Sequence, residues 1–173
     1  MAGFNKDPLI VCNNRFDVID IPTDSEVMLE VKVCVKDKNK TVKLDWSADE
    51  FLTVTFIPET GDQEITFDPI VTAEYTLCKN NEIIPEATVT SSLSNTLVLG
   101  LDGVDFTGSN FLTLNQNNQP NFTFCDTSPV LGVNCYQVKF RLTSDQTFEN
   151  NSSGTVGNRT LNAICGEKDK SSN

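Results

Sequence analysis

Histidine is absent from the 173 residues of this chain. The histidine side chain is the commonest general base in enzymes and the commonest metal ligand, because its charge changes near neutral pH. Without it the chain cannot build a Ser-His-Asp or Cys-His system, in which an imidazole activates the nucleophile. We therefore expect no enzymatic activity, no catalytic residue and no cofactor.

Long apolar runs are also absent. No stretch of the sequence approaches the roughly 18 consecutive apolar residues that a membrane-spanning helix needs. The first eight residues contain neither the basic start nor the apolar core of a secretory signal. We expect a protein that is made in the cytoplasm without a classical signal peptide and that has no membrane partner.

Positive charge is scarce. The chain has 13 Lys and Arg residues against 24 Asp and Glu residues, which gives a formal net charge of -11. A surface of this charge repels phosphate backbones and anionic lipid headgroups. We expect no nucleic-acid partner, and the simplest role of the charge is solubility.

Closely spaced cysteine pairs are missing as well. The cysteines never approach the Cys-x-x-Cys spacing of zinc knuckles, so we expect no metal site. The nearest pair is Cys125 and Cys135, at the end of one expected strand and the start of the next, where a disulfide is plausible if the two Cα atoms come within about 7 Å. All six cysteines are disulfide candidates: Cys12, Cys34, Cys78, Cys125, Cys135 and Cys165.

The positions of Cys12 and Cys165, beside the two chain ends, suit bonds between subunits. The alternatives are intramolecular bridges or buried thiols. Disulfides conflict with a cytoplasmic origin, where thiols are normally kept reduced. Three explanations stay open: the thiols remain reduced as small buried side chains, the protein leaves the cell without a signal, for instance when a mother cell lyses around a spore, or a leader has been removed.

Alternation of apolar and polar residues dominates what the sequence does contain. From Glu26 to Val35 every second residue is apolar, which predicts a half-buried strand. Further strands are expected at residues 41–46, 51–57, 65–77, 87–90, 96–101, 121–125, 136–143 and 155–165. Turn-forming residues separate them at 37–40, 60–62, 79–81, 102–103, 115–121 and 149–154.

About eight to ten short strands with intervening turns predict an all-β fold, a single jelly-roll-like β-sandwich with an N-terminal extension. We expect a connector arm at residues 1–12, the sandwich at 13–165 and a flexible polar tail at 166–173. The arm is apolar for a chain end, where free residues are usually polar. Its contact residues are expected to be Phe4, Leu9, Ile10, Val11 and Cys12.

Two uses of this arm are open. It forms the first strand of its own sandwich, or it adds to a sheet edge or groove of a neighbouring copy. The carboxylate pairs Asp49-Glu50 and Asp102 with Asp105 lack the ligand spacing of a calcium loop, and we interpret the segment with Asp102 and Asp105 as a solvated turn.

Several segments carry a resemblance: TVKLDWS (41–47), YTLCKNNEIIP (75–85), FTFCD (122–126), CYQV (135–138) and GTVGNRTLNAIC (154–165). Their order resembles a clostridial family of small cysteine-containing β domains of unknown function associated with sporulating bacteria, and more loosely the endospore-appendage subunits of bacilli. The resemblance implies synthesis in a mother cell, a jelly-roll subunit, and joining through N-terminal arms and disulfides. It matches Cys12 to the arm cysteine and Cys165 to the cysteine that closes the last strand.

We expect from this a structural, self-assembling subunit of a spore-surface appendage, pilus-like fibre or exosporium layer, with itself and other spore-surface proteins as partners. Late oxidation, after the mother cell lyses, would reconcile the cytoplasmic origin with disulfides. The first alternative is a ligand-binding β-sandwich, an adhesin or carbohydrate-binding module, whose platform combines a polar loop at 115–121 with Trp46, Tyr75 or Tyr136. The second is a viral capsid or spike jelly roll.

Overall fold

The computed structural model of the chain describes residues 9–56, 65–97, 112–144 and 151–167. These residues form ten β-strands and no helix, which confirms the all-β expectation. In chain order the strands are β1 (Leu9–Arg15), β2 (Ile19–Asp20), β3 (Glu26–Val35), β4 (Lys40–Phe56), β5 (Ile65–Lys79), β6 (Glu82–Leu97), β7 (Leu112–Asn118), β8 (Asn121–Asp126), β9 (Gly132–Ser144) and β10 (Asn151–Glu167).

The strands form two antiparallel sheets packed as a sandwich. The six-stranded sheet has the order β1-β10-β4-β7, with β2 added to β10 and β8 added to β4. The four-stranded sheet has the order β3-β9-β5-β6. Because β7 and β8 follow one another along the same edge of β4, they form one interrupted strand, and the two sheets then have the strand order of a jelly roll. The expected jelly-roll-like sandwich is confirmed.

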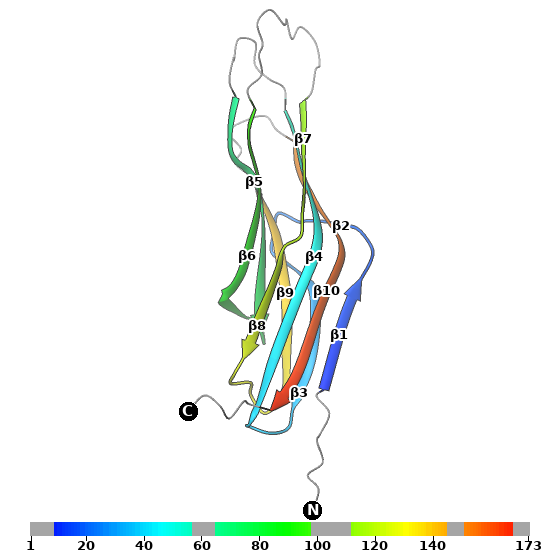
Figure 1. Ribbon diagram of the computed structural model, residues 1–173, viewed down its shortest axis with the longest axis vertical. Helices are drawn as coiled ribbons and strands as arrows, with labels where there is room; N and C mark the ends of the chain where they lie inside the picture. Colours follow the sequence, from blue (N-terminus) through cyan, green and yellow to red (C-terminus); the bar gives the residue numbers. More distant parts are fainter. Residues whose placement is uncertain (1–8, 57–64, 98–111, 145–150, 168–173) are drawn as a thin grey trace, which may run out of the picture.

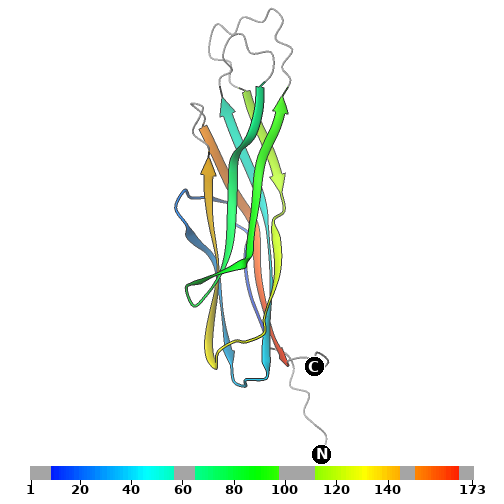
Figure 2. The same ribbon diagram turned by 90° about the vertical axis from the view of Figure 1, so that its left-hand side faces the viewer.

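The sandwich is long for its size. Strands β4 and β10 each contain 17 residues, whereas most strands in globular proteins have about 3–10. Leu9, Glu167 and the turn between β3 and β4 all lie at one end of the body (Figure 1). We call this the terminal end. Figure 2 shows the same body from the side of β5 and β6, drawn in green.

The core consists of the inward-facing residues of both sheets. In β3 the alternation predicted from the sequence is realised from Leu29 to Val35, whereas a register shift between Val27 and Leu29 leaves Val27 47% exposed. Trp46 is buried in this core. The centroid of its ring lies 4.8 Å from the ring centroid of Tyr75 and 5.2 Å from that of Phe122. Burial of this apolar surface is the main force that holds the two sheets together.

Two hydrogen bonds connect the sheets through the core. The Tyr75 hydroxyl on β5 donates to Glu50 on β4 at 2.6 Å, and the Tyr136 hydroxyl on β9 donates to Asp126 on β8 at 2.6 Å. Burial, followed by the neighbouring carboxylate, raises the pKa of both tyrosines. The hydroxyls therefore stay protonated and remain donors, so that each buried carboxylate keeps a partner.

The expected break between strands 41–46 and 51–57 is wrong, because β4 is continuous from Lys40 to Phe56. Residues 47–50 were expected to lie between these two strands. Instead Asp49 faces outward and Glu50, only 2% exposed, faces the core, where Tyr75 and Asn118 donate hydrogen bonds to it. Similarly β6 is one strand from Glu82 to Leu97, where two short strands were expected.

The expected loop at residues 115–121 is also wrong, since most of it belongs to β7. Amide side chains in this strand make cross-strand hydrogen bonds: the Thr53 hydroxyl donates to Asn115 Oδ1 at 3.1 Å, and Asn118 Nδ2 donates to Glu50 Oε1 at 2.7 Å. Only Gln119 and Pro120 separate β7 from β8. A run of Asn and Gln usually indicates a turn, but here partners on β4 hold it in a strand.

The expected turn at 149–154 overlaps the start of β10, which begins at Asn151. Gly154 is needed there for packing, not for a turn. A Cβ atom at this position would lie 2.9 Å from Ile21 Cδ1, 3.0 Å from Leu52 Cδ2 and 3.1 Å from Leu142 Cδ1. The glycine lets these three side chains meet above the backbone of β10.

The expected turn at 79–81 is confirmed. Asn80 and Asn81 have φ angles of 51° and 72°, as the two central residues of a type I′ hairpin turn require. The turn also attaches to β9, because Asn80 N–H donates to Cys135 O at 2.8 Å and Asn80 Oδ1 accepts from Cys135 N–H at 2.9 Å.

Among the described residues there is no helix that could cross a membrane.

Candidate functional site: strand edges and cysteines

All six cysteines lie in the described part of the chain, and each is a free thiol. Three of them are exposed: Cys12 on β1, Cys34 on β3 and Cys125 on β8. Each of these strands lies at an edge of its sheet. An edge strand has an unpaired row of backbone groups, so these thiols lie where a neighbouring copy would approach.

The other three cysteines lie on strands inside the sheets. Cys78 on β5 and Cys165 on β10 are buried, and Cys135 on β9 is half-buried. Burial is the main cause that raises the pKa of each of these thiols. Because the thiolate is the reactive form, these three are less reactive at neutral pH than an ordinary cysteine.

All six cysteines lie in the half of the sandwich toward the terminal end. Cys125 is paired with Lys43, and through Ile164 this row reaches Ile10 at the start of β1. Cys165 is paired with Leu9. Cys12 is paired with Asn162. On the other sheet the β3–β9 and β5–β9 registers place Cys34, Cys78 and Cys135 in the half where β3 turns into β4 (Figure 1).

The expected pairing of Cys125 with Cys135 finds no support in this geometry. Strands β8 and β9 belong to different sheets and do not form a hairpin. Cys125 directly follows the partly buried Phe124, and Cys135 directly precedes the buried Tyr136. Neighbouring side chains of a strand point to opposite faces of the sheet. The two thiols therefore point away from the core on opposite faces of the sandwich.

The residues expected in the contact arm divide into two groups. Leu9, Ile10, Val11 and Cys12 lie in β1, which pairs with β10 of the same chain. Val11 packs against the core, while Leu9 and Ile10 remain 47% and 58% exposed. Phe4 lies outside the described residues. At the other chain end, β10 continues to Glu167, two residues into the expected tail.

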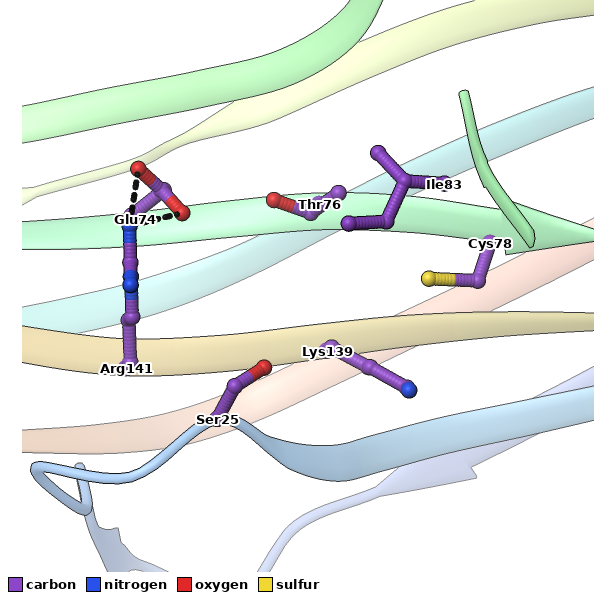
Figure 3. A pocket seen from close by; sticks show the side chains of 7 residues that line it. All are labelled: Ser25, Glu74, Thr76, Cys78, Ile83, Lys139 and Arg141. Atoms are coloured by element: carbon purple, nitrogen blue, oxygen red, sulfur yellow. Dashed lines mark hydrogen bonds and ion pairs between the residues drawn. The ribbon is translucent and has the colours of Figure 1, made fainter. Parts of the chain in front are cut away.

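A shallow pocket of about 150 Å³ opens on the outer face of the four-stranded sheet (Figure 3). Arg141 on β9 and Glu74 on β5 form an ion pair at its rim, with N–O distances of 3.0 and 3.1 Å. Lys139, also on β9, has no ion pair with any described residue. Ser25, Thr76, Cys78 and Ile83 complete the lining. The volume is enough for a few water-sized groups.

The aromatic platform expected for a sugar-binding site does not exist. Trp46, Tyr75 and Tyr136 are at most 2% exposed, and all three belong to the core. Asp102 and Asp105 lie outside the described residues. Among those described, no group of three or more Cys, Asp and Glu side chains is arranged to hold a metal ion.

Sequence reasoning missed three buried polar residues that organise the fold. Glu50 and Asp126 accept the two tyrosine hydrogen bonds, and Lys79 contacts Asp126 at 2.6 Å. Arg159, 4% exposed, donates to the Asp17 carbonyl at 2.6 Å and to its carboxylate at 3.2 Å. Only the inward parity of Glu50 within β4 could have indicated its burial.

Comparison with known proteins gives little. No protein-family model and no curated protein matches the chain. Among solved structures, the chain is similar to dimeric latent PorU from Porphyromonas gingivalis, with 8% identity and a TM-score of 0.34 over 93% of this chain and 13% of that one. It is also similar to the structure of infectious bursal disease virus Gx strain, with 9% identity and a TM-score of 0.35 over 93% of this chain and 37% of that one. The chain spans only a small part of either, and neither likeness supports an assignment.

Proposed function

We propose that this chain is a structural subunit that assembles with copies of itself into a fibre or layer on the surface of a bacterial spore, as an appendage, a pilus-like fibre or part of the exosporium. The observation that carries the proposal is the position of the exposed thiols. All three lie on edge strands, where strand addition and disulfide formation between copies use the same surface. The spore context comes from the sequence resemblance.

Strand addition would use backbone groups that the monomer leaves free. Within the described residues β1 pairs only with β10, and β8 pairs only with β4. Unpaired edges of this kind invite pairing with another chain, and soluble proteins usually block them. In a self-assembling subunit they provide the joint.

Oxidation would then stabilise joints that had already formed. A disulfide between two copies keeps a formed joint from dissociating until the bond is reduced. The net charge of -11 makes copies repel one another at low ionic strength. Assembly is therefore expected to require salt near or above the roughly 0.15 M at which the Debye length falls to about 8 Å.

The test is assembly of purified protein in oxidising buffer at low and physiological salt, observed by negative-stain electron microscopy and by gels with and without reductant. Fibres or sheets, with oligomer ladders that collapse on reduction, are the expected result. A variant lacking residues 1–8 keeps β1 intact and tests how far the segment before this strand contributes. A stable monomer in every buffer would overturn the proposal.

The pocket on the four-stranded sheet favours a second candidate, a module that binds a small polar ligand. Lys139 and the hydroxyls of Ser25 and Thr76 are the groups that would hold it. Thermal-shift screening of sugars and small anions, with Lys139→Met as control, tests this candidate. It replaces the self-assembly proposal only if the protein remains monomeric and a ligand raises its melting temperature.

A further inference from the structure

The edges of the two sheets differ in charge. On the six-stranded sheet, residues 9–14 of β1 and 121–125 of β8 contain no charged side chain. On the four-stranded sheet, β3 has charged residues at three positions, Glu26, Glu30 and Lys32, and β6 has Glu82 and Glu86. Charged side chains and proline are the usual devices that keep edge strands from pairing. The four-stranded sheet has them, and the six-stranded sheet lacks them on these stretches.

Two further features protect the edge strands of the four-stranded sheet from pairing. Asn13 Nδ2 donates to the Glu30 carbonyl on β3 at 2.9 Å, so a side chain of β1 already occupies one backbone acceptor there. In β6, Pro85 removes a backbone donor. The unprotected edges are thus β1 and β8, at opposite sides of the same sheet.

The directions of these two strands allow them to pair between copies. β8 is antiparallel to β4, β4 to β10, and β10 to β1, so β8 and β1 are antiparallel to each other. A second copy displaced sideways in the same orientation brings its β1 alongside β8 of the first. The result is an antiparallel pair and a six-stranded sheet that continues from one copy into the next.

The exposed thiols of both strands lie on the outer face of this sheet. Cys12 follows Val11, which packs against the core, and Cys125 follows the partly buried Phe124. Cys125 is level with Ile10, because Cys125 pairs with Lys43, Lys43 with Ile164, and Ile164 with Ile10 across the sheet. Cys12 is two residues from Ile10, a rise of about 7 Å along a strand. A neighbour shifted by this amount would place the two cysteines directly opposite.

Directly opposite residues in an antiparallel pair have Cα atoms about 4.5–5.5 Å apart. A disulfide requires about 4.4–6.8 Å. We propose that β8 of one copy pairs with β1 of the next and that Cys125 of the first forms a disulfide with Cys12 of the second. This inference rests on the proposed function and specifies its joint.

The bond forms by loss of two electrons and two protons from the two thiols. A small disulfide such as oxidised glutathione is the oxidant, accepts both electrons and leaves as two thiols. The contact is heterologous, because one side of a copy meets the opposite side of the next, and between copies in the same orientation such contacts continue without closing into a ring. Each copy is also shifted along the strand direction relative to the copy before it, so that the row of copies is staggered.

The experiment uses full-length chains with Cys12→Ser or Cys125→Ser, oxidised with oxidised glutathione in assembly buffer. Wild type is expected to give a ladder of disulfide-linked oligomers. Each variant alone lacks one half of the bond and is expected to give no ladder. An equal mixture of the two is expected to give a disulfide-linked dimer that extends no further, with the Cys12–Cys125 peptide identified by mass spectrometry. Cys34→Ser is the matched control and is expected to keep the ladder.

A second pair of variants tests the edge without touching a thiol. Ile10→Lys puts a charge on β1 at a residue 58% exposed, and Ile83→Lys puts one on β6 at a residue 64% exposed. We expect Ile10→Lys to reduce the yield of fibres at least tenfold and Ile83→Lys to leave it unchanged. Equal yields from both would overturn the pairing of β8 with β1.

The outcomes separate the two proposals. If fibres form but the ladder survives in Cys12→Ser or Cys125→Ser, the proposed function stands and this joint is wrong. A dimer of Cys125→Ser with itself, through Cys12 or Cys34, also overturns the joint. If wild type stays monomeric, both proposals fail.

Discussion

The central strands and the edge strands of this sandwich place their cysteines in different surroundings. The three cysteines of the central strands are buried or half-buried, and burial raises the pKa of each thiol. The three cysteines of the edge strands are exposed. The central strands also contain the buried Glu50 and its tyrosine partner. Apart from Asp126 at the end of β8, the stabilising polar groups of the core therefore lie on strands without exposed thiols, and a change on the outer face of an edge can alter assembly while the core stays folded.

The largest expected effect is on thiol reactivity. In monomeric, reduced protein, iodoacetamide should modify Cys12, Cys34 and Cys125 on the order of 100 times faster than Cys78 and Cys165, because reaction at the buried pair requires local opening of the sandwich. Pulsed alkylation followed by peptide mass spectrometry measures each rate. Equal rates for Cys78 and Cys12 would show that the central strands do not shelter their thiols.

The next effect concerns the tyrosine hydrogen bonds between the sheets. Tyr75→Phe leaves the buried Glu50 carboxylate with Asn118 as its only donor among the described residues, and we expect a loss of about 2 kcal/mol in unfolding free energy. Tyr136→Phe should cost less, about 1 kcal/mol, because Asp126 keeps its contacts with Lys79 and the Ser128 amide.

Urea unfolding in reducing buffer measures both tyrosine variants. Cys34→Ser on an edge strand is the control and should change the unfolding free energy by less than about 0.5 kcal/mol, as is usual for surface substitutions. If Tyr136→Phe proved more destabilising than Tyr75→Phe, the ion pair at Asp126 would not compensate for the lost hydroxyl.

The difference between centre and edge explains what the sequence could predict. The bounds of β3 follow from the alternation of apolar residues, a local pattern that did not predict the bulge between Val27 and Leu29, and the Asn80-Asn81 turn follows from residues that tolerate positive φ. The break in β4 and the loop at 115–121 were wrong because Glu50 and the amide side chains of β7 find partners only across strands distant in sequence. Periodicity carries no information about such partners.

The candidate site was predictable to a smaller extent. The sequence identified the cysteines and the β1 residues, but not which strands are edges, because strand order depends on pairing between distant segments. The ligand-binding alternative placed Trp46 or Tyr75 on a binding platform, but both residues lie in the core. For Trp46 the alternation with Lys43 and Asp45 already indicates the inward face, which the structure has.

A smaller effect is the pH dependence contributed by Asp126. Burial raises the pKa of this carboxyl, but hydrogen bonds from Lys79, Tyr136 and the Ser128 amide outweigh it, so that the pKa falls below the ordinary 3.8. A lowered pKa in the folded state stabilises the fold fully above pH 3.8, and this stabilisation is lost as the pH falls through the folded value. Unfolding free energies of wild type and Asp126→Asn should therefore differ at pH 6 and converge as the pH falls through the lowered pKa of Asp126. A constant difference would contradict this assignment.

The smallest expected effect on stability belongs to Glu30, on the edge strand β3. Hydrogen bonds from Gln137, and then from Lys32, lower its pKa to about 2. Its contact with Lys32 is at the surface, where ion pairs contribute little. Glu30→Gln should therefore destabilise the protein less than either tyrosine substitution. After burial, Glu30 is the next cause that raises the pKa of the Cys135 thiol, so the variant should lower that pKa toward 9.0. The pH dependence of Cys135 alkylation measures this. A changed thiol pKa with an unchanged unfolding free energy would show that an edge residue adjusts the chemistry of a central cysteine without supporting the fold.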